Sequence, residues 1–122
     1  MIKVVASDES RIVNIRVNGR QFAHEFGAAG QMFAKRFACQ QRLRILFDWT
    51  TLVEWDDDDA ASAACRQWRD AAPLIERAAI IHDHHWNRHA AVVAAILRTN
   101  SVDVRSWLVA DYRKALAWLN ER

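Results

Sequence analysis

The sequence predicts an α/β protein with a mixed, mostly parallel sheet of about five strands flanked by four helices. Short runs rich in β-branched residues alternate along the chain with longer segments whose apolar residues recur every three or four positions. The chain has 122 residues, of which 52% are hydrophobic, with only three glycines and one proline. This length suffices for one apolar core but not for two. We therefore expect a single domain over residues 1–122.

The first two expected strands are residues 2–6 and 11–17, with a polar segment between them. Asn18 and Gly19 form a turn signal that should end the second strand. The two strands would form a hairpin, with the first strand antiparallel at an edge of the sheet. A helix is expected over residues 21–39, because these residues recur on one helical face: Phe22, Phe26, Ala29, Phe33 and Phe37. We expect Phe26 and Phe33 to be core residues.

Three further pairs of strand and helix are expected in the rest of the chain. Residues 43–48 are a short apolar strand, and the acidic run Asp56–Asp59 should begin an Ala-rich helix that reaches Ala72. Carboxylates are favoured at a helix N-terminus, and Pro73 should stop the helix. The remaining strands are expected at residues 78–82 and 102–109, and the remaining helices at 84–98 and 112–121. The resulting order is ββαβαβαβα.

Charge and cysteine content limit the compartment and the partners. The formal net charge is +2, and the basic residues are interspersed with acids, so nucleic acid is not an expected partner. Cys39 and Cys65 both lie in Ala-rich helical segments and should be buried thiols rather than a disulfide. The N-terminal apolar run is too short for a signal peptide, and no segment has the length of a membrane span. We expect a cytoplasmic protein.

Histidines concentrate in residues 82–89, where His85 and His89 have the spacing of two metal ligands on a helix. Asp83 and His82 belong to the end of the preceding strand, and the general-base glutamate of a metalloprotease helix is absent. We interpret the segment as the solvated start of a helix, and we expect no bound metal.

Other patterns associated with catalysis are equally incomplete. The carboxylates of Glu54–Asp59 would diverge around a helix end, which indicates helix capping rather than acid–base chemistry. No serine has the glycine-flanked setting of a nucleophile elbow, and Gly27–Gly30 is not followed by the Lys-Ser or Lys-Thr of a phosphate loop. We expect neither an enzyme nor a cofactor.

The chain contains six tryptophans. Trp68, Trp107 and Trp118 are expected to pack within helices or strands. The other three follow strand ends, where open α/β sheets place their ligand sites. They are either lids over the core or an aromatic patch that contacts a ligand, a partner or a membrane surface. The candidate binding residues at this edge are Trp49, Thr50, Trp55, Asp56, His85 and Trp86.

Several short segments resemble the SpoIIAA-like family, relatives of the STAS domains typified by anti-sigma-factor antagonists. They are Ile45–Asp48, Trp55–Asp56, Ile80–Asp83 followed by Trp86, Val104–Arg105 and Ala115–Leu119. The resemblance implies a STAS-like fold that binds partners or small ligands and performs no chemistry. In the antagonists a serine at the start of the second helix is phosphorylated. Residues 53–59 contain no serine, so we do not expect that switch here.

The leading hypothesis is a non-catalytic STAS-like module that binds a protein partner or an apolar small molecule. The alternative is a lipid or membrane-surface domain, in which the second and third helices separate and expose their Ala- and Trp-rich faces. In both cases Trp55 and Trp86 would be the main contacts, and binding would depend weakly on salt because the net charge is low. Homodimerisation is a further alternative that the sequence leaves open.

Overall fold

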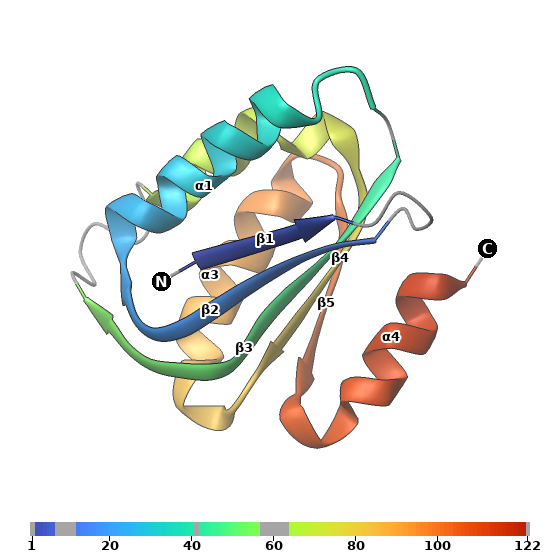
Figure 1. Ribbon diagram of the computed structural model, residues 1–122. Coiled ribbons are helices and arrows are strands. Elements are labelled where there is room, and N and C mark those ends of the chain that lie inside the picture. Colours follow the sequence, from blue (N-terminus) through green and yellow to red (C-terminus); the bar gives the residue numbers. More distant parts are fainter. Residues whose placement is uncertain (1, 7–11, 41, 57–63, 122) are drawn as a thin grey trace.

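The computed structural model describes residues 2–6, 12–40, 42–56 and 64–121 (Figure 1). Over these residues the strands form a five-stranded sheet in the order β1-β2-β3-β4-β5, in which only β1 and β2 pair antiparallel. The strands are β1 (Ile2–Ala6), β2 (Ile12–Phe22), β3 (Leu43–Asp56), β4 (Ile75–His82) and β5 (Asp103–Leu108). The principal helices are α1 (Ala23–Arg36), α3 (Asn87–Thr99) and α4 (Tyr112–Asn120). The predicted α/β class and mixed sheet are confirmed.

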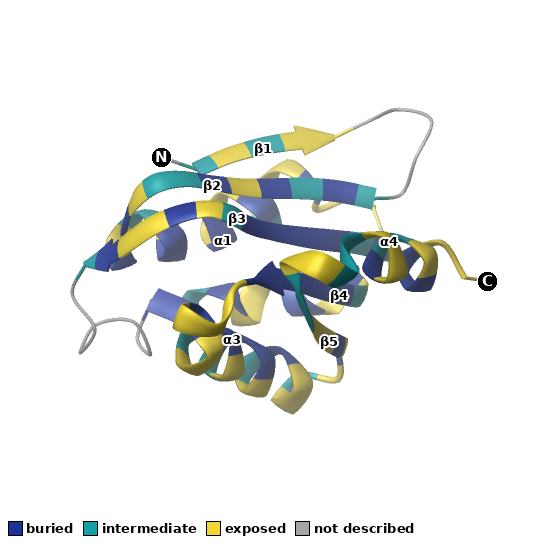
Figure 2. Ribbon diagram, turned by 90° about the horizontal axis from the view of Figure 1, so that it is seen from below, coloured by how far each residue is buried: buried dark blue, intermediate teal, exposed yellow. Residues whose placement is uncertain are grey.

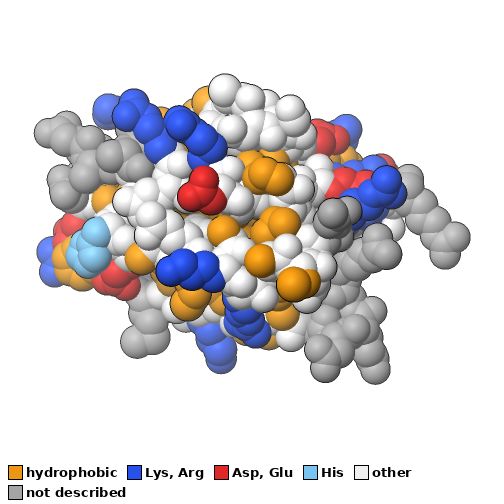
Figure 3. Space-filling model, turned by 90° about the horizontal axis from the view of Figure 1, so that it is seen from above, with side chains coloured by type: hydrophobic (Ala, Val, Ile, Leu, Met, Phe, Trp, Pro, Cys, Tyr) orange, Lys and Arg blue, Asp and Glu red, His pale blue; other side chains and the backbone are white. Residues whose placement is uncertain are grey.

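Helices cover the two faces of the sheet unequally (Figures 1 and 2). Side chains alternate between the faces, so Ile45 and Phe47 pack in the core beneath α1 and α3, whereas Leu46 packs against α4. The 3-10 turns η1 (Gln67–Asp70) and η2 (Ala72–Leu74) add to the α1 side. Seen from above, charged side chains surround a group of hydrophobic ones (Figure 3). No described helix is long and apolar enough to cross a membrane.

Asn18 and Gly19 do not end β2, contrary to the sequence prediction. Gly19 has a φ of 67°, and the strand continues to Phe22 in parallel pairing with β3. The register shifts twice, and each time β3 contributes one residue more than β2, as in a β-bulge. The glycine therefore bends the strand instead of reversing the chain. As a result α1 begins at Ala23, and Phe22 remains 36% exposed outside the core.

β3 is longer than predicted, because the extension of β2 gives it a pairing partner as far as Asp56. Asp56 is thus a strand residue, while residues 57–63, on which most of the predicted acidic helix start falls, lie outside the described residues. In the described part of the predicted second helix, residues 64–66 are α-helical and the chain continues as the 3-10 turn η1. Its predicted inner residues that the structure describes are nevertheless buried: Ala64, Cys65, Trp68 and Ala72.

The remaining boundaries differ by a few residues. β4 begins at Ile75, and α3 begins at Asn87 after a 3-10 turn over His84–Trp86. α1 ends at Arg36, so Cys39 lies beyond the helix and is exposed, whereas Cys65 is buried. The prediction that both thiols are buried was therefore wrong for Cys39. Phe26 and Phe33 are 0% and 1% exposed, which confirms that they are core residues.

Candidate functional site

Five rings from three parts of the chain meet at the end of β3 and are called here the aromatic cluster: Phe26, Trp49, Trp55, Trp86 and His89. Trp55 is central, with its ring centroid 5.3 Å from that of Phe26, 5.4 Å from Trp49 and 5.0 Å from His89. Trp86 completes the cluster through an edge-to-face contact with His89 at 5.1 Å. These separations are typical of stabilising aromatic pairs.

The two bulges of the β2–β3 pair explain how β3 buries Leu52 on the same face as Trp49 and Trp55. In a regular strand every second residue faces the same side. Here the inward residues of the outer half of β3 are Trp49, Leu52 and Trp55, at intervals of three. The first register shift turns Leu52 to the same face as Trp49, and the second restores the alternation, so Trp55, six residues after Trp49, also faces the core.

The turn after β4 positions the other side of the cluster. The Asp83 carboxylate accepts a hydrogen bond from the His85 backbone N–H at 2.8 Å, and the Asp83 carbonyl accepts one from Trp86 at 3.1 Å. This capped turn directs the Trp86 indole inward, where it is 4% exposed. His89 follows in the first turn of α3, so both residues are placed by local backbone geometry.

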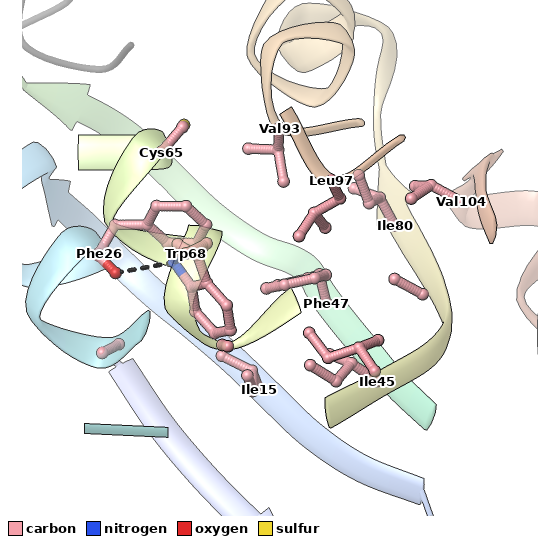
Figure 4. Packing of buried hydrophobic residues seen from close by; sticks show 14 of the residues in the cluster. Ile15, Phe26, Ile45, Phe47, Cys65, Trp68, Ile80, Val93, Leu97 and Val104 are labelled. Atoms are coloured by element: carbon pink, nitrogen blue, oxygen red, sulfur yellow. Dashed lines mark hydrogen bonds between the residues drawn. The ribbon is translucent and has the colours of Figure 1, made fainter. Parts of the chain in front are cut away.

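The aromatic cluster contains buried polar atoms that have no hydrogen-bond partner among the described residues. Trp49 and Trp55 are 1% and 6% exposed, and their indole Nε1 atoms have no hydrogen-bond partner among the described residues. By contrast, the Nε1 of Trp68 donates to the Phe26 carbonyl at 3.0 Å (Figure 4). A buried donor left unpaired costs about 1–3 kcal/mol. Trp49 and Trp55 thus leave the hydrogen bonding of this core incomplete among the described residues.

Gln21 adds an acceptor to the same region. It pairs with Trp55 in the β2–β3 ladder, is 0% exposed, and its Oε1 has no partner among the residues that the structure describes. The sequence analysis placed Gln21 at the start of a helix and missed this role. The signal that could have identified it is the continuation of β2 beyond Gly19, which places a polar side chain opposite a buried indole.

The sheet divides the six predicted site residues into two groups. Trp49, Trp55 and Trp86 belong to the aromatic cluster, and His85 contacts Trp86 with a centroid distance of 4.7 Å. Thr50 and Asp56 lie on the opposite side, where Thr50 bonds to Asp48 and Asp56 Oδ2 lies 2.5 Å from Arg20 Nε. The sequence analysis expected Trp49 and Trp55 to follow the end of a strand. That expectation was wrong, because both are residues of β3 itself. Whether any of the six binds a ligand stays a prediction.

On the opposite face, Asp48 lies at the centre of a group of polar side chains that pair with one another. Its Oδ1 accepts hydrogen bonds from the backbone N–H and hydroxyl of Thr50, at 3.0 and 2.7 Å, and its Oδ2 lies 3.5 Å from Arg16 Nε. Burial, with a contribution from Asp48, raises the pKa of Tyr112 and keeps its hydroxyl protonated. Because these groups satisfy one another, we interpret them as a structural link between β2, β3 and α4.

The histidines do not gather around a common centre. His82 Nδ1 lies 2.7 Å from the Asp83 carbonyl oxygen, while His85 and His89 pack against Trp86. Within the described part of the chain, no group of three or more His, Cys, Asp or Glu side chains could hold a metal ion. The absence of a bound metal stays a prediction.

Comparison with known proteins supports the fold. The family model described as SpoIIAA-like matches residues 12–120. The chain belongs to the SpoIIAA-like family.

One similar solved structure is an uncharacterised protein of the DUF3478 family from Shewanella loihica PV-4, which has a SpoIIAA-like fold. The two chains are 17% identical and superpose with a TM-score of 0.65, over 98% of this SpoIIAA-like chain and 92% of the other. At this identity the likeness concerns the fold alone. No curated protein matches the chain in sequence.

Proposed function

We propose that this SpoIIAA-like chain is a non-catalytic binding module whose aromatic cluster receives a small, largely apolar molecule carrying one hydrogen-bonding group. The observation that supports the proposal is the pair of buried indole N–H groups of Trp49 and Trp55, which lack a partner among the described residues. A guest that accepts hydrogen bonds would remove their desolvation cost.

The chemistry of the cluster limits the class of guest. Its rings offer apolar contact on several sides, and each 100 Å² of buried apolar surface contributes about 2.5 kcal/mol. The Trp49 and Trp55 nitrogens are donors only, and the Gln21 Oε1 is an acceptor. A hydroxyl or an uncharged carboxyl group meets both requirements, whereas an ionised group would be desolvated without a counter-charge. The guest is therefore an aliphatic or aromatic molecule with an alcohol or acid end.

Entry of a guest requires the covering helix to move, because the cluster is closed in this conformation. The inner face of α3 carries small side chains beside the cluster, and Ala90 and Ala94 are 1% and 2% exposed. Small residues interlock less than large ones, so a shift of α3 costs fewer contacts. A larger shift would expose the cluster to a membrane surface, which is the alternative that the experiment distinguishes.

The test is calorimetric titration with decanol, decanoic acid and phosphatidylglycerol vesicles. Trp55→Phe retains the ring but removes the N–H group, and Trp118→Phe is the matched control on the α4 side of the sheet. We expect saturable binding of decanol, and weaker binding of decanoic acid because it is ionised near neutral pH, and Trp55→Phe should weaken the binding of decanol by about five- to tenfold, the value of one hydrogen bond. Trp118→Phe should bind as wild type, and added salt should have little effect.

Three outcomes would contradict the proposal in different ways. Saturable binding that both Trp49→Phe and Trp55→Phe leave unchanged would place the site elsewhere. Association with vesicles alone would favour the membrane-surface alternative. No binding of any probe, together with a native mass spectrum free of a co-purified small molecule, would leave a protein partner as the remaining hypothesis.

A further inference from the structure

β1 leaves one edge of the sheet without a strand among the described residues. β1 pairs with β2 on one side only, and its residues are exposed or partly exposed along its whole length (Figure 2). The unpaired N–H and C=O groups of an edge strand are a template for another strand. The strand contains no proline and one charged residue, Lys3, while Val5 is 49% exposed. This edge therefore has little protection against pairing.

A groove of about 430 Å³ runs beside this edge, between β1 and α1. Ile2 and Val4 line it from the strand, and Ala28 and Met32 line it from the helix. Met32 is 53% exposed, and it continues the apolar lining of Ile2, Val4 and Ala28 into a contiguous patch of the kind that marks interaction sites. Hydrophobic side chains are visible between charged ones on this side of the molecule (Figure 3).

The helix residues that line the groove form a stripe with opposite charges at its two ends. Glu25, Ala28, Ala29, Met32 and Arg36 recur at intervals of three and four and share one face of α1. Glu25 lies in the first turn and Arg36 in the last, about 16 Å apart at about 1.5 Å per residue. Such a stripe, with small and apolar residues between its charged ends, is complementary to an antiparallel copy of itself.

We propose that a second copy of this chain occupies the groove, in a symmetric dimer that joins two β1 strands antiparallel. A twofold axis makes the same patch meet itself, so Glu25 of one copy faces Arg36 of the other. The α1 helices then run antiparallel across Ala28 and Met32, whose small and flexible side chains permit a close approach. The two sheets become one continuous sheet.

The residues of β1 select one register for this pairing. An axis centred on Val4 places the two Val4 residues opposite each other and sets each Lys3 opposite a Val5. An axis centred on Lys3 would place like charges directly opposite each other, which destabilises a strand pair. The Val4 register also keeps Ile2 and Val4 beneath the two helices, where they already line the groove.

This interface is separate from the aromatic cluster. Phe26 points from α1 into the core, with 0% exposure, whereas Met32 lies on the outer stripe. The dimer therefore does not depend on the proposed ligand, and either proposal can fail alone.

Sedimentation velocity and native mass spectrometry of the whole chain across a range of concentrations test the dimer. Met32→Glu should raise its dissociation constant at least about tenfold, because a carboxylate would be buried in the contact. Val53→Glu is the matched control, since it adds the same charge at a 76% exposed position on β3 and should leave the constant unchanged. Circular dichroism establishes that each variant is folded.

Charge reversal tests the antiparallel arrangement. Glu25→Arg and Arg36→Glu should each weaken the dimer by about two- to fivefold, and the double reversal should restore it, as expected for exposed ion pairs. A chain that stays monomeric at every soluble concentration would overturn the proposal, as would a dimer that Met32→Glu does not weaken. A dimer that the double reversal fails to restore would overturn the antiparallel pairing.

Discussion

Trp68 and Trp118 are both buried indoles, yet they lie on opposite faces of the sheet in different surroundings. Trp68 packs among aromatic rings, with centroids 5.5 Å from Phe26, 5.8 Å from Phe33 and 5.1 Å from Phe47. Trp118 instead lies against two guanidinium groups, its ring centroid 5.5 Å from that of Arg77 and 4.9 Å from that of Arg105. One face is a broad apolar core, and the other is a narrow apolar strip bordered by charge.

The difference shows that the two layers of helices are held by different forces. α1 and α3 are held by burial of aromatic and aliphatic surface. α4 buries fewer side chains and is also held at its C-terminal end, where Arg77 donates hydrogen bonds to the carbonyls of Trp118 and Glu121 at 2.8 and 3.0 Å. Cations are favoured at a helix C-terminus. The unpaired indoles of the aromatic cluster thus occur on the face where apolar packing is otherwise most complete.

The largest effect is expected from Phe26→Ala. Phe26 contacts four aromatic rings and has no exposed surface, so its removal should lower the free energy of unfolding by about 3–5 kcal/mol. Urea unfolding followed by far-UV circular dichroism measures the loss. A loss below about 1 kcal/mol would mean that the aromatic core contributes little to stability.

Leu119→Ala tests the α4 face with a side chain that is also 0% exposed. We expect a loss of about 2–3 kcal/mol, near the lower end of the range for buried leucines, because its apolar cluster is small and can relax around the gap. The same urea titration supplies the number. A loss larger than that of Phe26→Ala would reverse the ranking of the two faces.

The sequence predicts the fold well because periodicity is a property of whole elements. The burial of Phe26 and Phe33 and the alternation of strands and helices follow from spacing alone. The lengths of β2 and β3 do not, since they depend on a bulge that tertiary pairing permits. Asn18-Gly19 is compatible with both a turn and a bulge, and only the presence of β3 alongside decides between them.

The candidate site was predictable in part for the same reason. The sequence analysis ended the strand at residue 48, so it could not apply the alternation of two that puts Trp49 and Trp55 on the core face of β3 and Thr50 on the other. Gln21 was missed because its neighbours suggested a helix. The groove beside β1 was missed too. The stripe from Glu25 to Arg36 predicts a binding surface only together with the open strand edge beside it, and the sequence does not show that the two are neighbours.

A smaller effect is expected from Asp48→Asn. The amide oxygen can still accept the Thr50 N–H bond, but the attraction to the half-exposed Arg16 is lost. We expect the free energy of unfolding to fall by about 1 kcal/mol. Asp56→Asn, in the more exposed pair with Arg20, is the control and should cost about 0.5 kcal/mol or less. Equal losses would show that burial of the Asp48 carboxylate adds nothing.

The smallest effect under ordinary conditions concerns Cys65. Burial raises the pKa of its thiol from the usual 9.0 to about 12, whereas Cys39 is exposed. Since the thiolate is the nucleophile, iodoacetamide at pH 8 should modify Cys39 alone in the folded chain and both cysteines in denaturant. Peptide mass mapping distinguishes the two sites.

The same pKa fixes the sign of an alkaline effect on stability. Well below pH 9 the Cys65 thiol is protonated in both the folded and the unfolded chain, so its contribution to stability is constant. Between pH 9 and about 12 the unfolded chain loses this proton while the folded chain keeps it, and stability falls as the pH rises. At pH 9.5 the loss should be below about 1 kcal/mol and absent in Cys65→Ala, after its own cavity cost is subtracted. Rapid alkylation of Cys65 in the folded chain at pH 8 would contradict this prediction. It would show that η1 and α1 separate readily and that the core beneath α1 is not tightly closed.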